Sequence, residues 1–392
     1  MDHSDETYNY IYKRAIEKME RNREKLLEGG YNCIRHSFSR LSQFWPGVEK
    51  GKYYLVTASS GVGKSKWTKK TFVFDTVDFV MANPGANIDL KIFYFCLEES
   101  KVNFIQSLMS YQLYDKETIR KSVPQLNSVG SVAEEEHIEK VKEWKEYWET
   151  FENYVEVIDD IRHPTGIFKH VEKWLLENGH WEMENYQYKN EDGTFTVKQR
   201  RSHYVSDHPD RYVEVIIDHF GLLSQERQDD KLLSLHATMS KMSSTYFIQL
   251  RDGYDCSVIN VQQQAAETEK QQFTYKGQSI DSKVEPSLAG LGDNKLTQRD
   301  ADMAFGIFAP ERYEIEDHKG YNIVKLQDHY RSVIILKYRD GIANVRVGMF
   351  FDGATGHFEE LPPAEEMKQE DYEIYMGRVG LEPPTPVFKL ES

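Results

Sequence analysis

The chain has 392 residues and a formal net charge of −15, which argues against a protein that coats nucleic acid non-specifically but leaves room for a local basic channel. Its cysteines, Cys33, Cys96 and Cys256, lack metal-ligand spacing and indicate reduced thiols, and no apolar run approaches the length of a membrane span. We therefore expect a soluble cytoplasmic protein with no membrane partner, long enough for one large α/β domain with insertions.

The chain begins with a predicted amphipathic helix. Apolar residues recur near helical spacing over 8–27, acidic residues favour a helix start at Asp5, and Gly29-Gly30 ends the pattern. We expect residues 1–30 to form a helix separate from the main domain. Its apolar stripe has two candidate partners, a neighbouring subunit and its own domain, and the sequence favours neither.

A phosphate-binding loop of the A/G-x-x-x-x-G-K-[S/T] type follows at 58–65. The apolar run 52–57 predicts a strand before it, and 65–81 predicts a helix after it, which is the context that the motif requires. Ala58 stands where the commonest form of the motif has glycine. An accidental glycine-rich turn is the alternative, and the flanking strand and helix argue against it.

The residue types in this loop match the chemistry of phosphate binding. Gly61 and Gly63 let backbone N–H groups surround phosphate oxygens, and the following helix offers its positive end. Lys64 is placed to reach the terminal phosphates, and Ser65 to hold magnesium. The predicted nucleotide-binding residues are Ser60, Gly61, Val62, Gly63, Lys64, Ser65 and Lys66.

Strands and helices then alternate, which predicts a doubly wound sheet of the α/β class. The strands are continuous apolar runs suited to burial between helices, and Ser100 is a candidate N-cap. The predicted strands are 91–97, 154–158, 212–218 and 256–261, and the predicted helices are 100–114, 134–152, 164–177 and 232–250.

An insertion interrupts this alternation at about 181–211. Tyrosines and other residues alternate on both sides of Asp192-Gly193, which predicts a β-hairpin. The basic residues after the turn, Lys198, Arg200 and Arg201, have two explanations. A solvated surface cluster is favoured over a nucleic-acid contact.

The C-terminal third reads as a loop, several strands and a tail. The polar segment 267–294 predicts a long loop. Beyond residue 360, proline mixed with acidic residues predicts an arm without its own core, so the main domain is expected to span 31–360. The predicted strands are 303–308, 321–327, 333–338 and 344–350, the last two joined at Asp340-Gly341.

Acidic residues follow two of the predicted strands. Asp218 ends an apolar strand, where nucleotide hydrolases place a carboxylate beside magnesium. Glu98 and Glu99 follow the strand at 91–97, at the edge where open α/β sheets bind ligands. One of the two glutamates is a candidate to polarise the attacking water, and an exposed acidic pair that starts a helix is the alternative.

Polar and basic residues mark two further strand ends. A glutamine among Gln262, Gln263 and Gln264 is placed to sense a γ-phosphate, although a plain polar strand exit has the same pattern. Lys337 and Arg339 are two residues apart and share one strand face. They are candidates to stabilise charge that develops on a phosphate, in trans if that phosphate belongs to a neighbour, but spacing alone favours an ordinary basic edge.

Taken in order, these motifs resemble the C-terminal motor domain of DnaB-type replicative helicases, within the RecA-like ATPases, over roughly 31–360. Agreement of several motifs in one order is more specific than any single motif. The segments that carry the resemblance are 47–51, 58–65, 95–101 (Phe-Cys-Leu-Glu-Glu-Ser-Lys), 215–222 (Val-Ile-Ile-Asp-His-Phe-Gly-Leu), Gln263, 298–302 (Gln-Arg-Asp-Ala-Asp) and 337–341 (Lys-Tyr-Arg-Asp-Gly).

The resemblance implies a RecA-like core with ATP and Mg²⁺ as cofactors. It implies that Lys64 and Ser65 bind nucleotide and magnesium, and that Asp218 is the second acid beside the metal. It also favours Glu98 over Glu99 as the catalytic glutamate that activates water.

Two further roles follow from the resemblance. Gln263 resembles the γ-phosphate sensor of the family, with Gln262 as the open alternative. Lys337 and Arg339 resemble the pair that reaches into the site of the next subunit.

The function implied is that of an ATP-dependent helicase that forms a homo-oligomeric ring, six subunits in the family, and unwinds DNA during replication while moving on single-stranded DNA. Such a protein works in the cytoplasm of a bacterium or a phage-infected host. The loops 224–231 and 267–295 are expected to face the pore. The lysines of the second loop are Lys270, Lys276, Lys283 and Lys295.

The chain departs from the family pattern in three places. Only the helix at 5–28, which resembles the family's linker, stands where the family has an N-terminal domain that meets primase, so primase or a loader stays an open partner. The 181–211 insertion is unlike the compact family pattern, and glutamine and alanines follow the sensor in place of Leu-Asn-Arg. Two rival functions are a RecA-like recombinase and a non-translocating ATPase switch or scaffold.

Overall fold

A nine-stranded sheet forms the centre of the fold, in the order β17-β16-β15-β12-β1-β9-β6-β2-β3. The six strands from β12 to β3 run parallel, and β15, β16 and β17 continue the sheet in antiparallel pairs. The predicted α/β class with a mostly parallel sheet is confirmed. The strands are β1 (Tyr53–Ala58), β2 (Asp89–Cys96), β3 (Val155–Ile158), β6 (Arg211–Asp218), β9 (Ser257–Gln263), β12 (Met303–Phe308), β15 (Tyr330–Tyr338), β16 (Val345–Asp352) and β17 (His357–Glu360).

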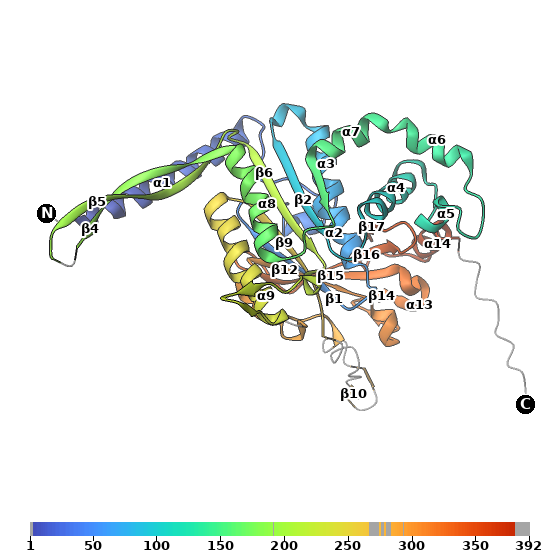
Figure 1. The fold of residues 1–392 in the computed structure, drawn as a ribbon. Coiled ribbons are helices and arrows are strands. Elements are labelled where there is room, and N and C mark those ends of the chain that lie inside the picture. The colour runs from blue at the N-terminus through green and yellow to red at the C-terminus, as the bar shows by residue number, and fades with distance from the viewer. Residues whose placement is uncertain are drawn as a thin grey trace, which may run out of the picture.

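Helices cover both faces of this sheet in the computed structural model (Figure 1). Along β1 the side chains alternate between two cores, with Tyr54 and Val56 in one and Tyr53 and Leu55 in the other. Burial on both faces explains why the parallel strands are continuously apolar. The helices are α1 (His3–Leu27), α2 (Lys64–Lys69), α3 (Asp75–Ala82), α4 (Lys101–Glu117), α5 (Val123–Leu126), α6 (Glu135–Glu143), α7 (Lys145–Tyr154), α8 (Pro164–Glu177), α9 (Leu235–Lys241), α12 (Thr297–Asp300), α13 (Ile323–Leu326) and α14 (Gln369–Arg378).

The structure describes most of the chain. No helix in the described ranges is long and apolar enough to cross a lipid bilayer. Most of the predicted 267–294 loop, including Lys270, Lys276 and Lys283, lies outside them, and so does the tail beyond residue 380. The described residues are 3–190, 192–265, 274–275, 278–279, 284–292 and 294–380.

Two of the predicted helices continue through π-helical turns. The helix predicted at 65–81 is one helical stretch in which the π-helical segment Lys70–Phe74 joins α2 to α3. The helix predicted at 232–250 begins at α9, because the Ser234 hydroxyl accepts the N–H of Ala237 and caps it. It then continues through π-helical turns as far as Gly253.

The predicted insertion is a long β-hairpin, β4 (Gly179–Lys189) paired with β5 (Phe195–Ser206). It projects from the body of the molecule, as α1 also does (Figure 1). Near its base, residues of α1 and β5 line one open groove, and Lys25 pairs with Asp210. The apolar residues Tyr12, Met19, Leu26 and Leu27 of α1 remain exposed, so packing of its stripe on its own domain is not observed for these residues.

One C-terminal strand prediction is wrong. The segment 321–327 holds only the short strand β14 (Tyr321–Asn322) before helix α13 begins. The Asn322 side chain accepts the N–H of Lys325 at 3.0 Å, and this N-cap favours a helical turn over an extended chain. Ile323 and Leu326, three residues apart, then point into the same core, as helical spacing allows.

The segment predicted as an arm without a core also differs from expectation. Its acidic composition hides an aromatic pair at helical spacing. In α14, Tyr372 and Tyr375 are buried and pack in one cluster with Phe350 and Leu361. Strand β17, which no motif indicated, extends the sheet just before this segment. The described domain therefore reaches residue 380 rather than 360.

Candidate active site

The phosphate-binding loop connects β1 to α2 at the carboxyl edge of the parallel strands, as predicted. Gly61 and Gly63 adopt φ angles of +69° and +109°, a region that glycine enters without strain. A Cβ on Gly63 would also lie 3.0 Å from the ring of Phe351. Lys64 begins α2 and is buried. The backbone of the loop therefore needs both glycines.

A buried arginine holds the loop from the antiparallel half of the sheet. Arg331 on β15 is fully buried, and its Nε donates to the carbonyl oxygen of Val62 at 2.7 Å. The rest of its guanidinium donates to the backbone of Asp328 and Tyr330 and to the Asp328 carboxylate. Burial lowers the pKa of Arg331, and the neighbouring Asp328 opposes this. One side chain thus fixes the loop to β15.

A second arginine contacts the next two carbonyl groups of the loop. Arg312, in the 3₁₀ turn Pro310–Tyr313, donates to the carbonyl oxygens of Ser60 and Gly61. Cations bound to carbonyl oxygens polarise those peptide groups and favour an anion on the N–H side. The sequence prediction missed both arginines because each recognises backbone carbonyls and stands in no motif.

The predicted magnesium side chains lie together. The Ser65 hydroxyl donates to Asp218 Oδ1 at 3.0 Å, and the Tyr94 hydroxyl donates to Asp218 Oδ2 at 2.6 Å. Asp218 is only 3% exposed, at the end of β6. Burial, and then the charge of Asp218, raises the pKa of Tyr94 well above its usual value, so Tyr94 stays a neutral donor. Tyr94 is a further residue that the sequence prediction missed.

These residues fit a magnesium-bound nucleoside triphosphate. Mg²⁺ prefers hard oxygen ligands and is commonly held by one or two protein oxygens together with phosphate oxygens and water. Ser65 and Asp218 supply such oxygens beside the loop. The N-terminus of the helical stretch that starts at Lys64 adds a positive dipole end at the same place.

The two glutamates after β2 have different surroundings. Glu99 pairs with Lys69, so its carboxylate already has a partner. Glu98 is exposed at the carboxyl edge, and its charge acts on His219, which directly follows Asp218. This arrangement favours Glu98 over Glu99 as the residue near the terminal phosphate, in line with the prediction.

The three glutamines at the end of β9 also differ. The Gln262 amide donates to the carbonyl oxygens of Gly292 and Asn294, and its Oε1 accepts the Thr297 hydroxyl. Gln264 is likewise held, by Thr57 and Ser287. The structure therefore gives Gln262 a fixed role in packing.

Gln263 points to the other face of β9, as the alternation of strand side chains requires. It lies opposite Ala58, at the start of the phosphate loop. Its side chain also acts on the pKa of His219. Of the two predicted sensors, Gln263 is the one near the site.

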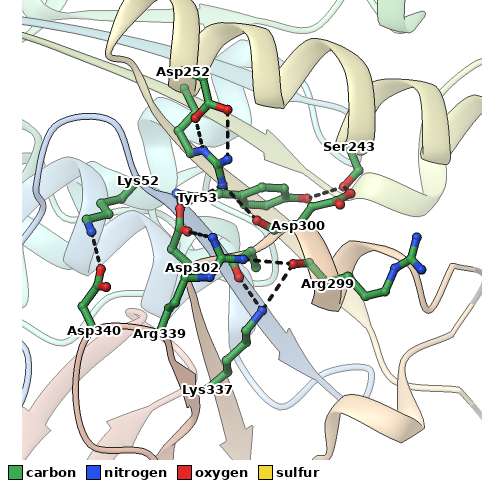
Figure 2. Close-up of polar contacts among 12 residues, drawn as sticks. Lys52, Tyr53, Ser243, Asp252, Arg299, Asp300, Asp302, Lys337, Arg339 and Asp340 are labelled. Atoms are coloured by element: carbon green, nitrogen blue, oxygen red, sulfur yellow. Dashed lines mark hydrogen bonds and ion pairs between the residues drawn. The ribbon is translucent and has the colours of Figure 1, made fainter. Parts of the chain in front are cut away.

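Lys337 and Arg339 form a separate cluster, shown in Figure 2. The Lys337 ammonium donates to the carbonyl oxygens of Gln298 at 2.7 Å and Ala301 at 2.6 Å. Arg339 pairs with the Asp302 carboxylate at 2.7 Å. The segment 298–302, singled out in the sequence, thus anchors both cations. Burial, and then the like charge of Arg339, lowers the pKa of Lys337.

This cluster lies at the opposite edge of the sheet from the phosphate loop. Lys337 is level with Ala304, near the start of β12, because β15 runs antiparallel to it. Met303, at that start, is level with Tyr54 of β1, whereas the loop follows the far end of β1. Six residues of strand span about 20 Å. Within one chain, the structure does not bring the two cations to the loop.

The fold has counterparts of known function. No family model and no curated protein matches the chain. A DnaB-like helicase ATPase domain, solved on its own, matches with a TM-score of 0.61 and 18% identity, over 92% of this chain and 100% of that domain. The fold is that of a DnaB-type helicase motor domain. A DnaB-like replicative helicase, solved to show its interactions with primase, also matches at 0.61 and 18%, over 89% of this chain and 66% of its own.

Proposed function

We propose that this chain is the motor subunit of a ring-shaped DNA helicase that hydrolyses ATP between neighbouring subunits and moves along single-stranded DNA. Two observations support it: a fold shared with helicase ATPase domains over 92% of the chain, and the Ser65–Asp218 pair beside a phosphate loop. The observation that carries the ring is the position of Lys337 and Arg339, a full strand length from their own loop. A second copy then supplies the missing cations.

In this proposal, the chain's own residues prepare the terminal phosphate for attack. The phosphate loop and Lys64 bind the phosphates, while Ser65 and Asp218 hold Mg²⁺, whose charge helps to neutralise them. Glu98 orients and polarises the attacking water. Gln263, at the end of β9, registers the terminal phosphate.

The neighbouring copy completes the charge balance. Its Lys337 and Arg339 approach the phosphate and stabilise the negative charge that develops during transfer. In the described structure these cations rest on carbonyl groups and on Asp302, contacts that a modest rearrangement exchanges for phosphate oxygens. Subunits arranged head to tail in this way close into a ring, with six as the expected number.

An acidic chain binds DNA only if its cations are concentrated along the DNA path. The segment 224–231 includes the strand β7 (Arg227–Gln228), which is exposed, and Lys295 is exposed as well. We propose that these loops face single-stranded DNA in the pore. Primase or a loader is a proposed partner, by analogy with the helicase solved with its primase interactions.

The direct test is strand displacement on a forked DNA with ATP and magnesium. We expect the wild type to unwind and Lys64→Ala to lose unwinding, because Lys64 binds the phosphates. Lys173→Ala is the matched control: this lysine is exposed on α8 and pairs only with Glu177, so its loss should leave unwinding intact. Normal unwinding by Lys64→Ala would contradict the proposed mechanism.

The same preparations separate the rival functions. Open filaments in electron micrographs, without unwinding, would indicate a recombinase. ATP turnover that DNA does not stimulate, together with no unwinding, would indicate an ATPase switch or scaffold.

A further inference from the structure

His219 is a histidine built into the site that no motif assigned. It directly follows Asp218 at the end of β6 and is only 9% exposed. Its Nδ1 accepts the backbone N–H of Gly221 at 3.2 Å. Since Nδ1 acts as the acceptor, the neutral ring carries its proton on Nε2.

The other ring nitrogen faces the catalytic groups. Four residues of the site act on the ring electrostatically: Lys64, Asp218, Glu98 and Gln263. Burial, and then the charge of Lys64, lowers the pKa of His219, which keeps the ring neutral. Nε2 is buried and has no hydrogen-bond partner of ordinary geometry among the described residues. A buried donor left in this way costs about 1–3 kcal/mol, so an acceptor is expected nearby.

The side-chain oxygen of Gln263 is the acceptor that fits. Strands β6 and β9 are neighbours in the sheet, and Asp218 lies level with Val261, two residues before Gln263. Gln262 and Gln264 have hydrogen-bonded amides, whereas no hydrogen bond of ordinary geometry to the Gln263 side chain is found within the described ranges. An amide presents its oxygen and its NH₂ group with almost the same shape, so a neighbouring donor decides which way it faces.

We infer that His219 donates its Nε2–H to Gln263 Oε1 and thereby turns the Gln263 NH₂ group toward the terminal phosphate. In the reverse orientation, the amide oxygen would face phosphate oxygens and repel them. His219 is thus a positioning residue that acts through the sensor, and the inference rests on the proposed function of this site.

Two conservative substitutions separate the halves of the imidazole. His219→Asn keeps an acceptor near Nδ1 for the Gly221 N–H but removes the Nε2 donor. His219→Gln keeps a donor near Nε2 but removes the Nδ1 acceptor. We expect both to fold, with DNA-stimulated kcat reduced about tenfold or more in His219→Asn and largely retained in His219→Gln. The KM for ATP should change little in either, because neither substitution touches the phosphate loop.

A double-mutant cycle tests whether His219 acts through Gln263. If it does, adding Gln263→Ala to His219→Asn lowers kcat no further than Gln263→Ala alone. Full activity of His219→Asn, equal loss in His219→Gln, or additive effects would each overturn the inference.

The inference also has a readout that does not need turnover. The side-chain amide NMR signals of Gln263, assigned by their loss in Gln263→Ala, should shift on adding ATPγS in the wild type and not in His219→Asn. Equal shifts in both would overturn the role of His219. A wild type that neither hydrolyses ATP nor unwinds DNA would instead refute the proposed function, so the two failures are distinguishable.

Discussion

Arg331 shows how a single buried charge supports the phosphate loop. Its guanidinium joins the carbonyl oxygen of Val62 to the turn at Asp328, and thus the parallel half of the sheet to the antiparallel half. Arg312 reaches the same loop from the surface, where its side chain is exposed. The two arginines have similar contacts and opposite burial, so their removal should have different consequences.

We expect Arg331→Met to lower the free energy of unfolding by about 3 kcal/mol, because it leaves several buried carbonyl groups without donors. Arg312→Ala should lower it by less than about 1 kcal/mol, since water replaces the exposed guanidinium. Instead, Arg312→Ala should weaken ATP binding several-fold through its effect on the loop. Urea unfolding and nucleotide titration measure the two effects. Equal stability losses in the two variants would contradict this division.

Part of the site was predictable because its chemistry is local in sequence. Lys64 and Ser65 lie within one motif, and Asp218 ends an apolar strand, so each carries its own signal. Tyr94 and Arg331 carry none, because a tyrosine or an arginine in a strand has many uses. Only the fold shows that Tyr94 meets Asp218.

The β4–β5 hairpin depends on the domain only at its base. There Trp181 and Tyr204 pack against Tyr254 with ring centroids about 5 Å apart, and the Tyr204 hydroxyl donates to the Leu175 carbonyl. Farther out, its side chains mostly contact one another. Lys198, for example, lies over the ring of Tyr188 at 3.5 Å. An isolated two-stranded hairpin is marginally stable in water, so this outer part adds little to the domain.

Replacing residues 185–199 with Asn-Gly, which joins the facing residues Glu184 and Arg200 through a tight turn, should therefore leave the Tm within about 2 °C of the wild type. Trp181→Ala is the contrasting variant. It should lower the Tm by several degrees, because it removes an aromatic contact at the base. Thermal unfolding followed by circular dichroism measures both, and a large loss of Tm in the shortened protein would show that the hairpin tip supports the core.

The elements differ in how well their sequence predicted them. The buried parallel strands follow apolar runs, because both of their faces are covered. The short helix α13 was mistaken for a strand, since its buried residues Ile323 and Leu326 also fit an extended run. The cap at Asn322 was the overlooked signal. In α14, acidic residues outnumber the two tyrosines that bury it, so composition misled where helical spacing was informative.

Across the whole molecule, the two halves of the site occupy opposite edges of one sheet. A variant defective in one half can therefore be rescued by a variant defective in the other. In a random mixture of Lys64→Ala and Arg339→Ala, about a quarter of the head-to-tail interfaces pair an intact loop with an intact arginine. We expect ATP turnover in the mixture to exceed that of either variant alone, in a steady-state ATPase assay.

The control for this experiment is a mixture of each variant with Lys64→Ala,Arg339→Ala, which forms no competent interface and should show no gain. A lack of recovery in the first mixture, although native mass measurements show mixed rings, would contradict the role of Arg339 in trans.

Strand β1 links these two halves directly. At its start, the N–H of Tyr53 donates to Asp302 at 2.9 Å, and Asp302 also holds Arg339. At its end, the phosphate loop begins after Ala58. One stiff strand thus runs from the contact that serves a neighbour's nucleotide to the loop that binds its own. A ring of such subunits is a polar chain of levers, and release of phosphate at one interface has a mechanical route to the next in one circular direction only.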